Sequence, residues 1–430
     1  MDKQDSFEIL GLGGKKTLEG KIEVKGAKNA VLKVLASSLL FKDEMALSNV
    51  PRIDDVSKML EVLADLGVKV EQQATDKYYL ITKNISNSDI TLGIAQKMRS
   101  SIVITGPLLA RLGQVTFPYP GGCVIGKRPI DFFLNGFAKM GAKVSLKSDI
   151  YTVTTEGKKL QGAEIFFKNQ SVTGTETFLM AAVLAEGKTT LKNCALEPEI
   201  ESLARFLIGC GAKIKGLGTS TLTITGGPLL TGRGKTYRTM PDRIEAGSFI
   251  ILAALAGKNI EVCDCEPKHL DSLLNILRSA GVNIEIKTTS VRVRDHGQKY
   301  LATDIKTHEY PGFPTDLQAP MAVFLTQAEG QSFIFETIFE GRLNYLEALN
   351  RMGAKARVLD ALRALIDGPT PLFGREVESP DLRAGLAYLL AGVIAKGKTI
   401  VHNVHYIDRG YEQIDKRLAK LGVKIKRLVN

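Results

Sequence analysis

The residues with the clearest chemical potential lie between positions 117 and 131, where one cysteine stands among glycines and cations. Cys123 has glycines at 121, 122 and 126 around it, and Lys127 and Arg128 follow closely. Glycine gives such a loop unusual backbone freedom, and nearby cations stabilise a thiolate and make a cysteine acidic and reactive. Taken alone, an ordinary surface loop with an inert thiol is the commoner case, because most cysteines are buried and unreactive. The rest of the chain has to decide between these two interpretations.

A second group of chemically suggestive residues gathers where helices are expected to begin. A helix N-terminus carries free N–H groups and a partial positive charge, so it binds anions and disfavours cations. Ser, Thr and Asp at such positions are usually caps, but capping does not explain a cation there. The cations at or near expected helix starts therefore indicate an anionic ligand, and they are Lys28, Arg99, Arg128, Arg342, Arg383 and Arg409.

These expected helices belong to a pattern that recurs six times along the chain. In each copy a helix-like stretch ends at a glycine and a strand-like stretch follows, as in Ala64 to Val70. The glycines lie at 67, 141, 211, 281, 353 and 422, so the intervals are 74, 70, 70, 72 and 69 residues. A glycine at this position is typical of a helix C-cap. Each unit is therefore predicted as helix, strand, loop, helix, strand and strand.

Six such units in 430 residues predict an α/β protein of two domains with three units each. A solenoid is the competing architecture, but its periods are usually shorter, about 20 to 50 residues. We expect one domain at 25–234, carrying the Cys123 loop, and a second formed by 1–24 with 235–430, carrying Asp316. The N-terminal strand region, 7–24, is expected to pair with the second domain. The first helix of several units is apolar all round, which predicts buried helices.

Composition excludes several classes of protein. Hydrophobic residues make up 44% and charged residues 24% of the chain, as in globular proteins. The sequence contains no run of about 18 apolar residues, so no membrane span is predicted. The N-terminus lacks the apolar core of a signal peptide. Five scattered cysteines favour free thiols in the cytoplasm, and Cys263-Asp264-Cys265 lacks the second pair that a zinc site needs. The net charge of +11 is spread along the chain, which favours a small anionic substrate over nucleic acid without deciding the matter.

Five motifs, taken together, resemble the UDP-N-acetylglucosamine 1-carboxyvinyltransferase family. They are Gly26 to Ala30, Pro120 to Pro129, Pro314 to Asp316, Asp381 to Ala384 and Ile407 to Glu412. The resemblance covers nearly the whole chain and keeps the motifs in order. It implies the enolpyruvyl transferase fold, a two-domain inside-out α/β barrel of six βαβαββ units with helices inside and sheets outside. It also implies an active site in the cleft between the domains, with the Cys123 loop as a lid.

The resemblance further implies a reaction, in which the enolpyruvyl group of phosphoenolpyruvate passes to the 3-hydroxyl of UDP-N-acetylglucosamine and phosphate is released. This is the first committed step of peptidoglycan synthesis, and it proceeds by addition and elimination without cofactor or metal. Cys123 would protonate the methylene carbon and could form a covalent adduct, while Asp316 would take the proton from the sugar hydroxyl. Lys28 and Arg409 complete the implied catalytic set.

The resemblance also assigns two binding sets. Cations that hold phosphate and carboxylate groups dominate the set for phosphoenolpyruvate, which is Lys28, Asn29, Arg128, Arg342, Arg383 and Arg409. The set for UDP-N-acetylglucosamine is Arg99, Arg128, Pro129, Ile130, Asp131, Phe132, Ser171, Val172, Asp316 and Ile338. Asp381 is expected to orient Cys123 or an arginine. The chain departs from the family pattern at Phe133, Asn169 and Tyr406, which leaves the affinity for the nucleotide open.

Three alternatives stay open at this stage. The sister enzyme 5-enolpyruvylshikimate-3-phosphate synthase shares the fold but uses no lid cysteine. A non-catalytic paralogue that binds a nucleotide sugar would not need the intact set of Cys123, Asp316 and arginines. A basic nucleic-acid-binding protein would show aromatic and basic clusters, whereas only 7% of residues are aromatic and they are scattered. The oligomeric state is not defined by the sequence, and a monomer is the expectation.

Overall fold

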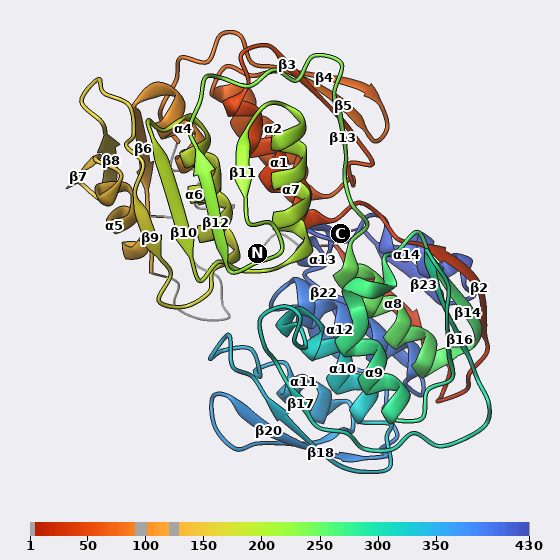
Figure 1. Ribbon diagram of the computed structural model, residues 1–430. Coiled ribbons are helices and arrows are strands. Elements are labelled where there is room, and N and C mark those ends of the chain that lie inside the picture. The colour runs from red at the N-terminus through yellow and green to blue at the C-terminus, as the bar shows by residue number, and fades with distance from the viewer. Residues whose placement is uncertain (1–4, 91–100, 120–128, 430) are drawn as a thin grey trace. The chain divides into compact units, whose positions relative to one another are not determined.

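The computed structural model describes residues 5–90, 101–119 and 129–429, and these form two compact units. The N-terminal unit consists of the described residues between Gly26 and Met240. The C-terminal unit consists of the described residues from Pro241 onward, together with residues 5–25. The ribbon in Figure 1 follows the chain by colour from red at the N-terminus to blue at the C-terminus.

The N-terminal unit alternates helices and short strands. Its elements are α1 (Lys28–Ser37), η1 (Ser38–Leu40), β3 (Glu44–Ser48), α2 (Asp54–Asp65), β4 (Lys69–Ala74), β5 (Lys77–Ile81), α4 (Ile102–Leu112), β6 (Gln114–Pro118), α5 (Asp131–Lys139), β7 (Lys143–Lys147), β8 (Ile150–Thr154), β9 (Glu164–Phe166), α6 (Val172–Leu184), β10 (Lys188–Lys192), α7 (Pro198–Gly209), β11 (Lys213–Lys215), β12 (Thr221–Thr225) and β13 (Thr236–Arg238).

The C-terminal unit repeats the same alternation after two N-terminal strands. Its elements are β1 (Ser6–Leu10), β2 (Leu18–Glu23), α8 (Arg243–Ala256), β14 (Gly257–Cys263), η3 (Pro267–Leu270), α9 (Asp271–Ser279), β15 (Ile284–Ile286), β16 (Ser290–Arg294), β17 (Ile305–Lys306), η4 (Thr315–Leu317), α10 (Gln318–Leu325), β18 (Gly330–Phe335), α11 (Leu346–Arg351), β19 (Lys355–Val358), β20 (Arg363–Gly368), β21 (Glu376–Glu378), α12 (Leu382–Ile394), β22 (Lys398–His402), α13 (His405–Asp408), α14 (Ile414–Lys420) and β23 (Lys424–Leu428).

The six glycines that define the repeat all adopt left-handed backbone conformations. Their φ angles are 99° at Gly67, 87° at Gly141, 109° at Gly211, 92° at Gly281, 110° at Gly353 and 100° at Gly422. A side chain is strained at such angles, so glycine lets each helix stop and the chain turn into a strand. The predicted helix C-caps are therefore confirmed.

Sheet pairing follows the repeat with three exchanges. A short parallel strand precedes the first helix of five units, and in unit two a single parallel bridge of Asp89 to Thr116 is found instead. In three of the five units this strand joins the sheet of its own unit, as β9 joins β10. The strand before α1, β2, instead pairs with β14, and the strand before α8, β13, pairs with β3. The sixth unit has one strand after α14, and β1 supplies the other by lying between β22 and β23. The N-terminal strand region thus pairs with the C-terminal unit, as predicted. The prediction that unit six ends in two strands of its own is wrong, because β1 takes the place of one of them.

The first helices of the units form the cores. In the C-terminal unit α8, α10 and α12 contact one another, and Figure 1 shows them between the strands β14 and β16 on one side and β18 and β20 on the other. Every residue of α8 is buried. In the N-terminal unit α4 contacts both α1 and α6. Helices that are apolar all round occupy the interior because no face of them gains from contact with water, so the prediction of buried helices is confirmed.

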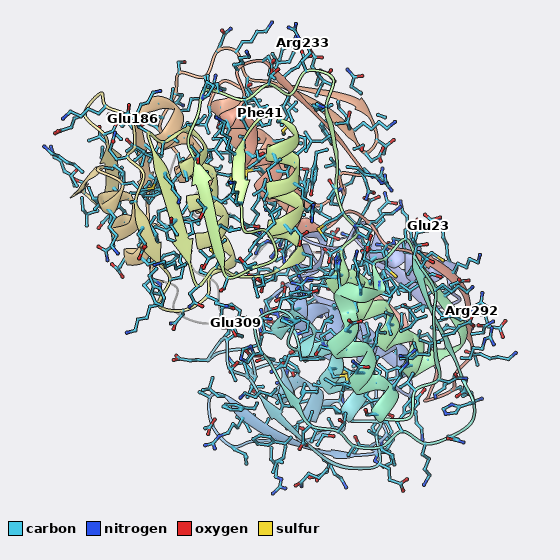
Figure 2. The ribbon with its side chains drawn as sticks, in the orientation of Figure 1. Glu23, Phe41, Glu186, Arg233, Arg292 and Glu309 are labelled. Atoms are coloured by element: carbon cyan, nitrogen blue, oxygen red, sulfur yellow. The ribbon has the colours of Figure 1, made fainter. Side chains whose placement is uncertain are left out.

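Polar side chains fix the edges of these cores. Arg111, in the last turn of α4, donates to the carbonyl oxygens of Leu39, Phe41 and Thr82 at 3.0, 2.6 and 2.6 Å. These three bonds join η1 and its C-cap Phe41 to Thr82, the residue that follows β5. In Figure 2 the labelled Phe41 belongs to the interior of its unit, whereas Arg292 lies on the outer face of its sheet. There Arg292 donates to Glu261 at 2.6 Å, so charged residues face outward and apolar residues inward.

The described residues contain neither a membrane-spanning helix nor a cluster of metal ligands. No helix among them is both long enough and apolar enough to cross a membrane. No group of three or more His, Cys, Asp or Glu side chains in the described part of the chain is arranged to hold a metal ion.

Candidate active site

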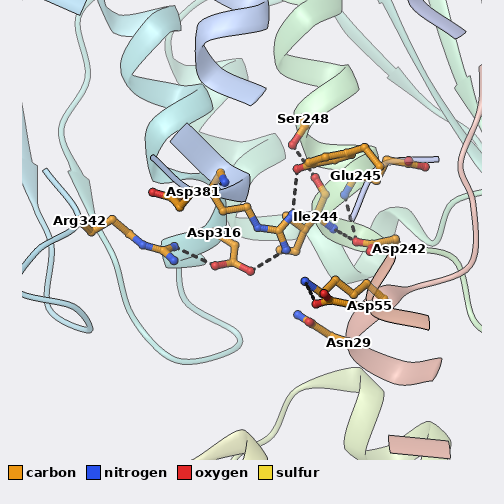
Figure 3. A network of polar contacts seen from close by, with 12 residues as sticks. Asn29, Asp55, Asp242, Ile244, Glu245, Ser248, Asp316, Arg342 and Asp381 are labelled. Carbon is orange, nitrogen blue, oxygen red and sulfur yellow. Dashed lines mark hydrogen bonds and ion pairs between the residues drawn. The ribbon is translucent and has the colours of Figure 1, made fainter. Parts of the chain in front are cut away.

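Asp316, in η4, is the centre of a buried ionic network in the C-terminal unit. Its Oδ1 accepts a hydrogen bond from Nη1 of Arg342 at 2.8 Å, and its Oδ2 accepts one from Nη2 of Arg383 at 2.8 Å. The side chains of the two arginines are 7% and 8% exposed and that of Asp316 is 24% exposed. The close view in Figure 3 shows the guanidinium group of Arg342 directed at the Asp316 carboxylate. Three residues that the sequence assigned to chemistry are thus in direct contact.

Charge, rather than solvent, sets the protonation of this network. Burial alone would raise the pKa of Asp316, but the positive charges of Arg383 and Arg342 outweigh burial and hold that pKa far below its usual range. Burial would conversely lower the pKa of Arg383, and the Asp316 carboxylate raises it instead. The network therefore contains one fixed negative and two fixed positive charges, so it carries a net positive charge.

Local sequence explains why Arg383 lies at this place. Asp381 is the N-cap of α12, and its Oδ1 accepts the backbone N–H groups of Arg383 and Ala384 at 2.7 and 3.1 Å. A capping aspartate starts a helix and satisfies two free donors. Asp381 therefore places Arg383 through the backbone, and in this structure its described bonds are to the helix rather than to an arginine side chain.

Glu336 braces the two segments that carry Asp316 and Arg342. Its Oε1 accepts the backbone N–H groups of Ile338 and Phe339 at 2.8 and 3.1 Å, and its Oε2 accepts the hydroxyl of Thr315 at 2.9 Å. Glu336 is fully buried, so it joins the neighbour of Asp316 to the loop that leads to Arg342. Glu336 could not be recognised from the sequence, because a single glutamate at the end of a strand belongs to no motif.

The segment after α13 carries Arg409, which was expected in the site, and Tyr411, which lies in the same sequence motif but was given no role. Tyr411 is 1% exposed, and its hydroxyl accepts a hydrogen bond from Nη1 of Arg383 at 2.8 Å. Arg409, expected at a helix start, lies instead at the C-cap of α13. That expectation is wrong, and a cation at a helix C-terminus is favoured by the helix dipole. Asp408, beside it, is held by Arg427 of β23 at 2.6 and 2.9 Å.

In the N-terminal unit, Lys28 is the first residue of α1 and lies opposite an acidic residue. Its Nζ is 2.7 Å from Oδ2 of Asp55, which is in the first turn of α2, and the two side chains are 12% and 2% exposed. Asn29 follows Lys28 in α1 and is half-buried. A carboxylate partner explains how a cation is kept at a helix start, where the dipole alone disfavours it. Asp55 was not singled out, because acidic residues in a first helical turn are common.

The expected nucleotide residues of the N-terminal unit come from two helix starts that meet. Ser171 caps α6 and accepts the N–H of Gly174 at 3.1 Å, and Val172 is the first residue of that helix. A Cβ on Gly174 would lie only 2.6 Å from the ring of Phe132, which belongs to α5. Glycine thus permits the start of α5 to touch the start of α6. The adjacent positions are an exposed Pro129, a buried Ile130 and an exposed Asp131.

The three residues that depart from the family pattern, Phe133, Asn169 and Tyr406, lie in different surroundings. Phe133 is 4% exposed and packs against Phe132 and Phe178, with ring centroids 3.9 and 6.2 Å apart, so it is a core residue. Asn169 is exposed. Tyr406 lies against the ring of His405, with centroids 4.1 Å apart.

Cys123, Arg99 and Arg128 lie outside the residues that the structure describes. The four cysteines within the described residues are free thiols. Burial raises the pKa of Cys194 and of Cys210 to about 11, and that of Cys265 to about 12. Burial also raises the pKa of Cys263. None of these four thiols has the low pKa that makes a cysteine a ready nucleophile.

Comparisons with known proteins define the class. Residues 12–418 match the family described as EPSP synthase (3-phosphoshikimate 1-carboxyvinyltransferase). The enolpyruvyl transferase NikO from Streptomyces tendae has a similar structure, with a TM-score of 0.87, full coverage of both chains and 21% identity. EPSP synthase from Acinetobacter baumannii gives a TM-score of 0.74 at 18% identity, covering 99% of this chain and 100% of its own. At such identities these structures establish the enolpyruvyl transferase fold, and the prediction of that fold is confirmed.

Closer relatives narrow the class. UDP-N-acetylglucosamine 1-carboxyvinyltransferase from Koribacter versatilis is 43% identical over 427 residues, which are 99% of this chain and 96% of the relative. The protein of the same name from Desulforapulum autotrophicum is 41% identical over 424 residues, 99% of this chain and 100% of its own. The chain therefore belongs to the UDP-N-acetylglucosamine 1-carboxyvinyltransferase family of enolpyruvyl transferases.

Proposed function

We propose that this protein transfers the enolpyruvyl group of phosphoenolpyruvate to the 3-hydroxyl of UDP-N-acetylglucosamine, releasing phosphate, as the first committed step of peptidoglycan synthesis. The observation that carries the proposal is the identity of 41–43% over nearly the whole chain to relatives that bear the name of this activity. The Asp316–Arg342–Arg383 network adds a carboxylate and two cations in contact, as such a reaction between anions needs.

The addition step needs a base and an acid. Asp316 accepts the proton of the sugar 3-hydroxyl as that oxygen bonds to C2 of phosphoenolpyruvate, and Cys123 donates a proton to the C3 methylene carbon. The product of addition is a tetrahedral ketal phosphate. Elimination then breaks the bond from C2 to the phosphate oxygen, and the Cys123 thiolate takes back one proton from C3, which restores the double bond. The proton held by Asp316 leaves with the inorganic phosphate, so both residues return to their starting states.

The pairing of Asp316 suggests how its basicity is controlled. In the structure both carboxylate oxygens accept bonds from arginines, and a carboxylate with so low a pKa is a weak base. An arriving carboxylate or phosphate competes for the same donors. As Arg342 and Arg383 turn to the substrate, Asp316 loses part of the stabilisation of its charged form and its pKa rises. Substrate binding thus prepares the base.

The remaining cations complete the proposed binding set. Lys28 and Arg409 face the phosphate that leaves, together with Arg128, and Arg342 and Arg383 hold the carboxylate. Asn29 contacts the reacting groups. The nucleotide sugar is contacted by Pro129 to Phe132, Ser171, Val172, Arg99 and Ile338. The starts of α5 and α6 meet at Gly174, which supports a single binding surface for Pro129 to Phe132, Ser171 and Val172.

We also propose that the protein acts as a monomer in the cytoplasm. All candidate residues belong to one chain, so no second copy is needed to complete either set. The free thiols of Cys194, Cys210, Cys263 and Cys265 accord with a reducing compartment.

A phosphate-release assay tests the function. Purified protein is given phosphoenolpyruvate with UDP-N-acetylglucosamine, with shikimate 3-phosphate, or alone. We expect stoichiometric phosphate and the enolpyruvyl ether only in the first mixture, and no turnover by Asp316→Asn. Asp360→Asn, which alters an exposed aspartate paired with Arg363, is the matched control and should act as the wild type.

The alternative function, transfer to shikimate 3-phosphate, takes its support from the description of the matched family. Phosphate release with shikimate 3-phosphate and none with UDP-N-acetylglucosamine would replace the proposed acceptor. Binding of UDP-N-acetylglucosamine without any release would favour a regulatory paralogue.

A further inference from the structure

We propose that Tyr411, backed by Ser248, is a positioning residue that holds Arg383 while this arginine passes from Asp316 to an anionic substrate. The inference rests on the proposed function for the identity of that substrate, an enol phosphate that also carries a carboxylate. The two terminal nitrogens of the Arg383 guanidinium group have different partners. Nη2 of Arg383 donates to Asp316 at 2.8 Å, and Nη1 donates to the hydroxyl of Tyr411 at 2.8 Å.

The two acceptors differ in their access to solvent. The Asp316 side chain is 24% exposed, whereas Tyr411 is 1% exposed and packs among the core residues of its unit. A ligand that comes from solvent can therefore compete for the Asp316 side of Arg383, while the Tyr411 side is covered by protein. The bond to Tyr411 is the one that can persist through an exchange of partners.

Counting protons gives the direction of a hydrogen-bond chain behind Arg383. The arginine can only donate, so the Tyr411 oxygen accepts and keeps its own proton free to donate. The Tyr411 hydroxyl is also hydrogen-bonded to the side chain of Ser248 in α8. Ser248 Oγ lies 2.7 Å from the carbonyl oxygen of Ile244, to which it donates its single proton. Ser248 therefore accepts from Tyr411, and the chain from Arg383 through Tyr411 and Ser248 ends in the backbone of α8.

Tyr411 has the properties that this chain requires. Burial raises the pKa of its phenol, and the charge of Arg383 lowers it only in part, so the hydroxyl stays neutral and keeps a proton to donate. The ring adds support, because the Cζ atom of Arg383 lies 5.7 Å from its centroid. With Nη1 held by Tyr411, the Nη2 atom of Arg383 stays directed toward Asp316 or its replacement.

Steady-state kinetics of the full-length protein test the positioning role. For Tyr411→Phe, which keeps the ring, we expect the KM for phosphoenolpyruvate to rise roughly tenfold, as one bond to a charged group is lost. The KM for UDP-N-acetylglucosamine should stay within about twofold, since no bond to that substrate is removed. Ser248→Ala should give a smaller rise, and the double variant should be no worse than Tyr411→Phe, because both residues act along one chain. Tyr388→Phe is the matched control, because Tyr388 is a buried tyrosine of the same helix as Arg383 whose hydroxyl donates to a backbone carbonyl.

A second measurement does not depend on the reaction. Rotation about the Cζ–Nη bonds of Arg383, assigned by NMR with Arg383→Lys, should be slow in the ligand-free wild type and faster in Tyr411→Phe. Unchanged rotation in Tyr411→Phe would overturn the positioning role. So would kinetic effects of Tyr411→Phe and Ser248→Ala that add in the double variant and raise the KM for phosphoenolpyruvate and the KM for UDP-N-acetylglucosamine equally. If the wild type releases no phosphate with either acceptor while rotation responds as expected, the proposed function fails and the tie between Tyr411 and Arg383 stands.

Discussion

Arg342 donates from Nη1 to Oδ1 of Asp316 at 2.8 Å, although 26 positions separate the two residues in the chain. A second arginine occupies the other oxygen, so the carboxylate has a cation on each side. These two ion pairs explain how Arg342 and Arg383 are kept in a buried site. They also explain why Asp316 is a weak base before substrate binds. Burial of either arginine without Asp316 would leave a desolvated charge uncompensated.

The first prediction concerns the pKa of Asp316 in the ligand-free protein. Arg342→Met keeps the bulk of the side chain and removes one cation, so the burial that raises the pKa is opposed by Arg383 alone. We expect the pKa to rise from far below its usual range, measured as the midpoint of the Asp316 carboxyl ¹³C shift against pH. Arg351→Met, which removes an exposed arginine paired with Glu347, should leave the midpoint alone. An unshifted midpoint in Arg342→Met would show that Arg342 does not control this carboxylate.

The second prediction concerns chemical labelling of cysteine. We expect the epoxide phosphonate fosfomycin to modify Cys123 alone, since its epoxide is opened by a thiolate and the four described thiols have raised pKa values. UDP-N-acetylglucosamine should accelerate the reaction. Peptide mass spectrometry locates the adduct, and Cys123→Asp, which keeps an acid at that position, should resist labelling. An adduct at Cys194 or Cys210 would reject the assignment of Cys123.

The third prediction is a pH dependence of stability that arises in the N-terminal unit. Glu176 of α6 is fully buried, and burial raises its pKa to about 7 from 4.5, although Lys33 lies 3.3 Å away and lowers it. The folded protein therefore holds this proton more tightly than the unfolded chain. The stabilisation is complete below pH 4.5 and is lost as the pH rises to about 7, which amounts to roughly 3 kcal/mol of unfolding free energy.

Glu176→Gln isolates that contribution, because glutamine stays neutral at every pH. We expect the unfolding free energy of the wild type, from urea titrations, to fall between pH 5 and pH 8 relative to that of Glu176→Gln. Glu164→Gln changes an exposed glutamate that is paired with Lys192, and should keep the wild-type slope. Parallel curves for Glu176→Gln and the wild type would mean that Glu176 has an ordinary pKa in the folded state.

Local patterns were enough to predict the repeats and the core. Each repeat glycine occupies a backbone conformation that only its own type adopts without strain, so its spacing carried structural information directly. The buried first helices were predictable for a similar reason, because an apolar helix has one stable environment. The sites of Asp316 and Arg383 followed from the same pattern, since both lie at starts of those helices.

Contacts between distant segments could not be predicted in the same way. The exchange of β2 and β13 between sheets depends on where whole strands lie, and either strand is compatible with either sheet by composition. Arg409 was placed at the wrong end of a helix, because α13 is only four residues long and too short to show a period. Tyr411 stood within a recognised motif, but its partner Arg383 is 28 positions away and the contact depends on the packing of α12 against α13.

The last prediction concerns Glu336, which no sequence pattern indicated. Glu336→Ala would leave the N–H groups of Ile338 and Phe339 and the hydroxyl of Thr315 without their buried acceptor. Since these atoms fix the loop toward Arg342 and the segment of Asp316, we expect kcat/KM to fall roughly 10- to 100-fold, corresponding to the loss of two or three such bonds. Glu336→Gln keeps one carbonyl oxygen for the two N–H groups, and Thr315 can accept from the new amide, so it should retain most of the activity. The same kcat/KM in Glu336→Ala and the wild type would show that Asp316 and Arg342 hold their geometry without this brace.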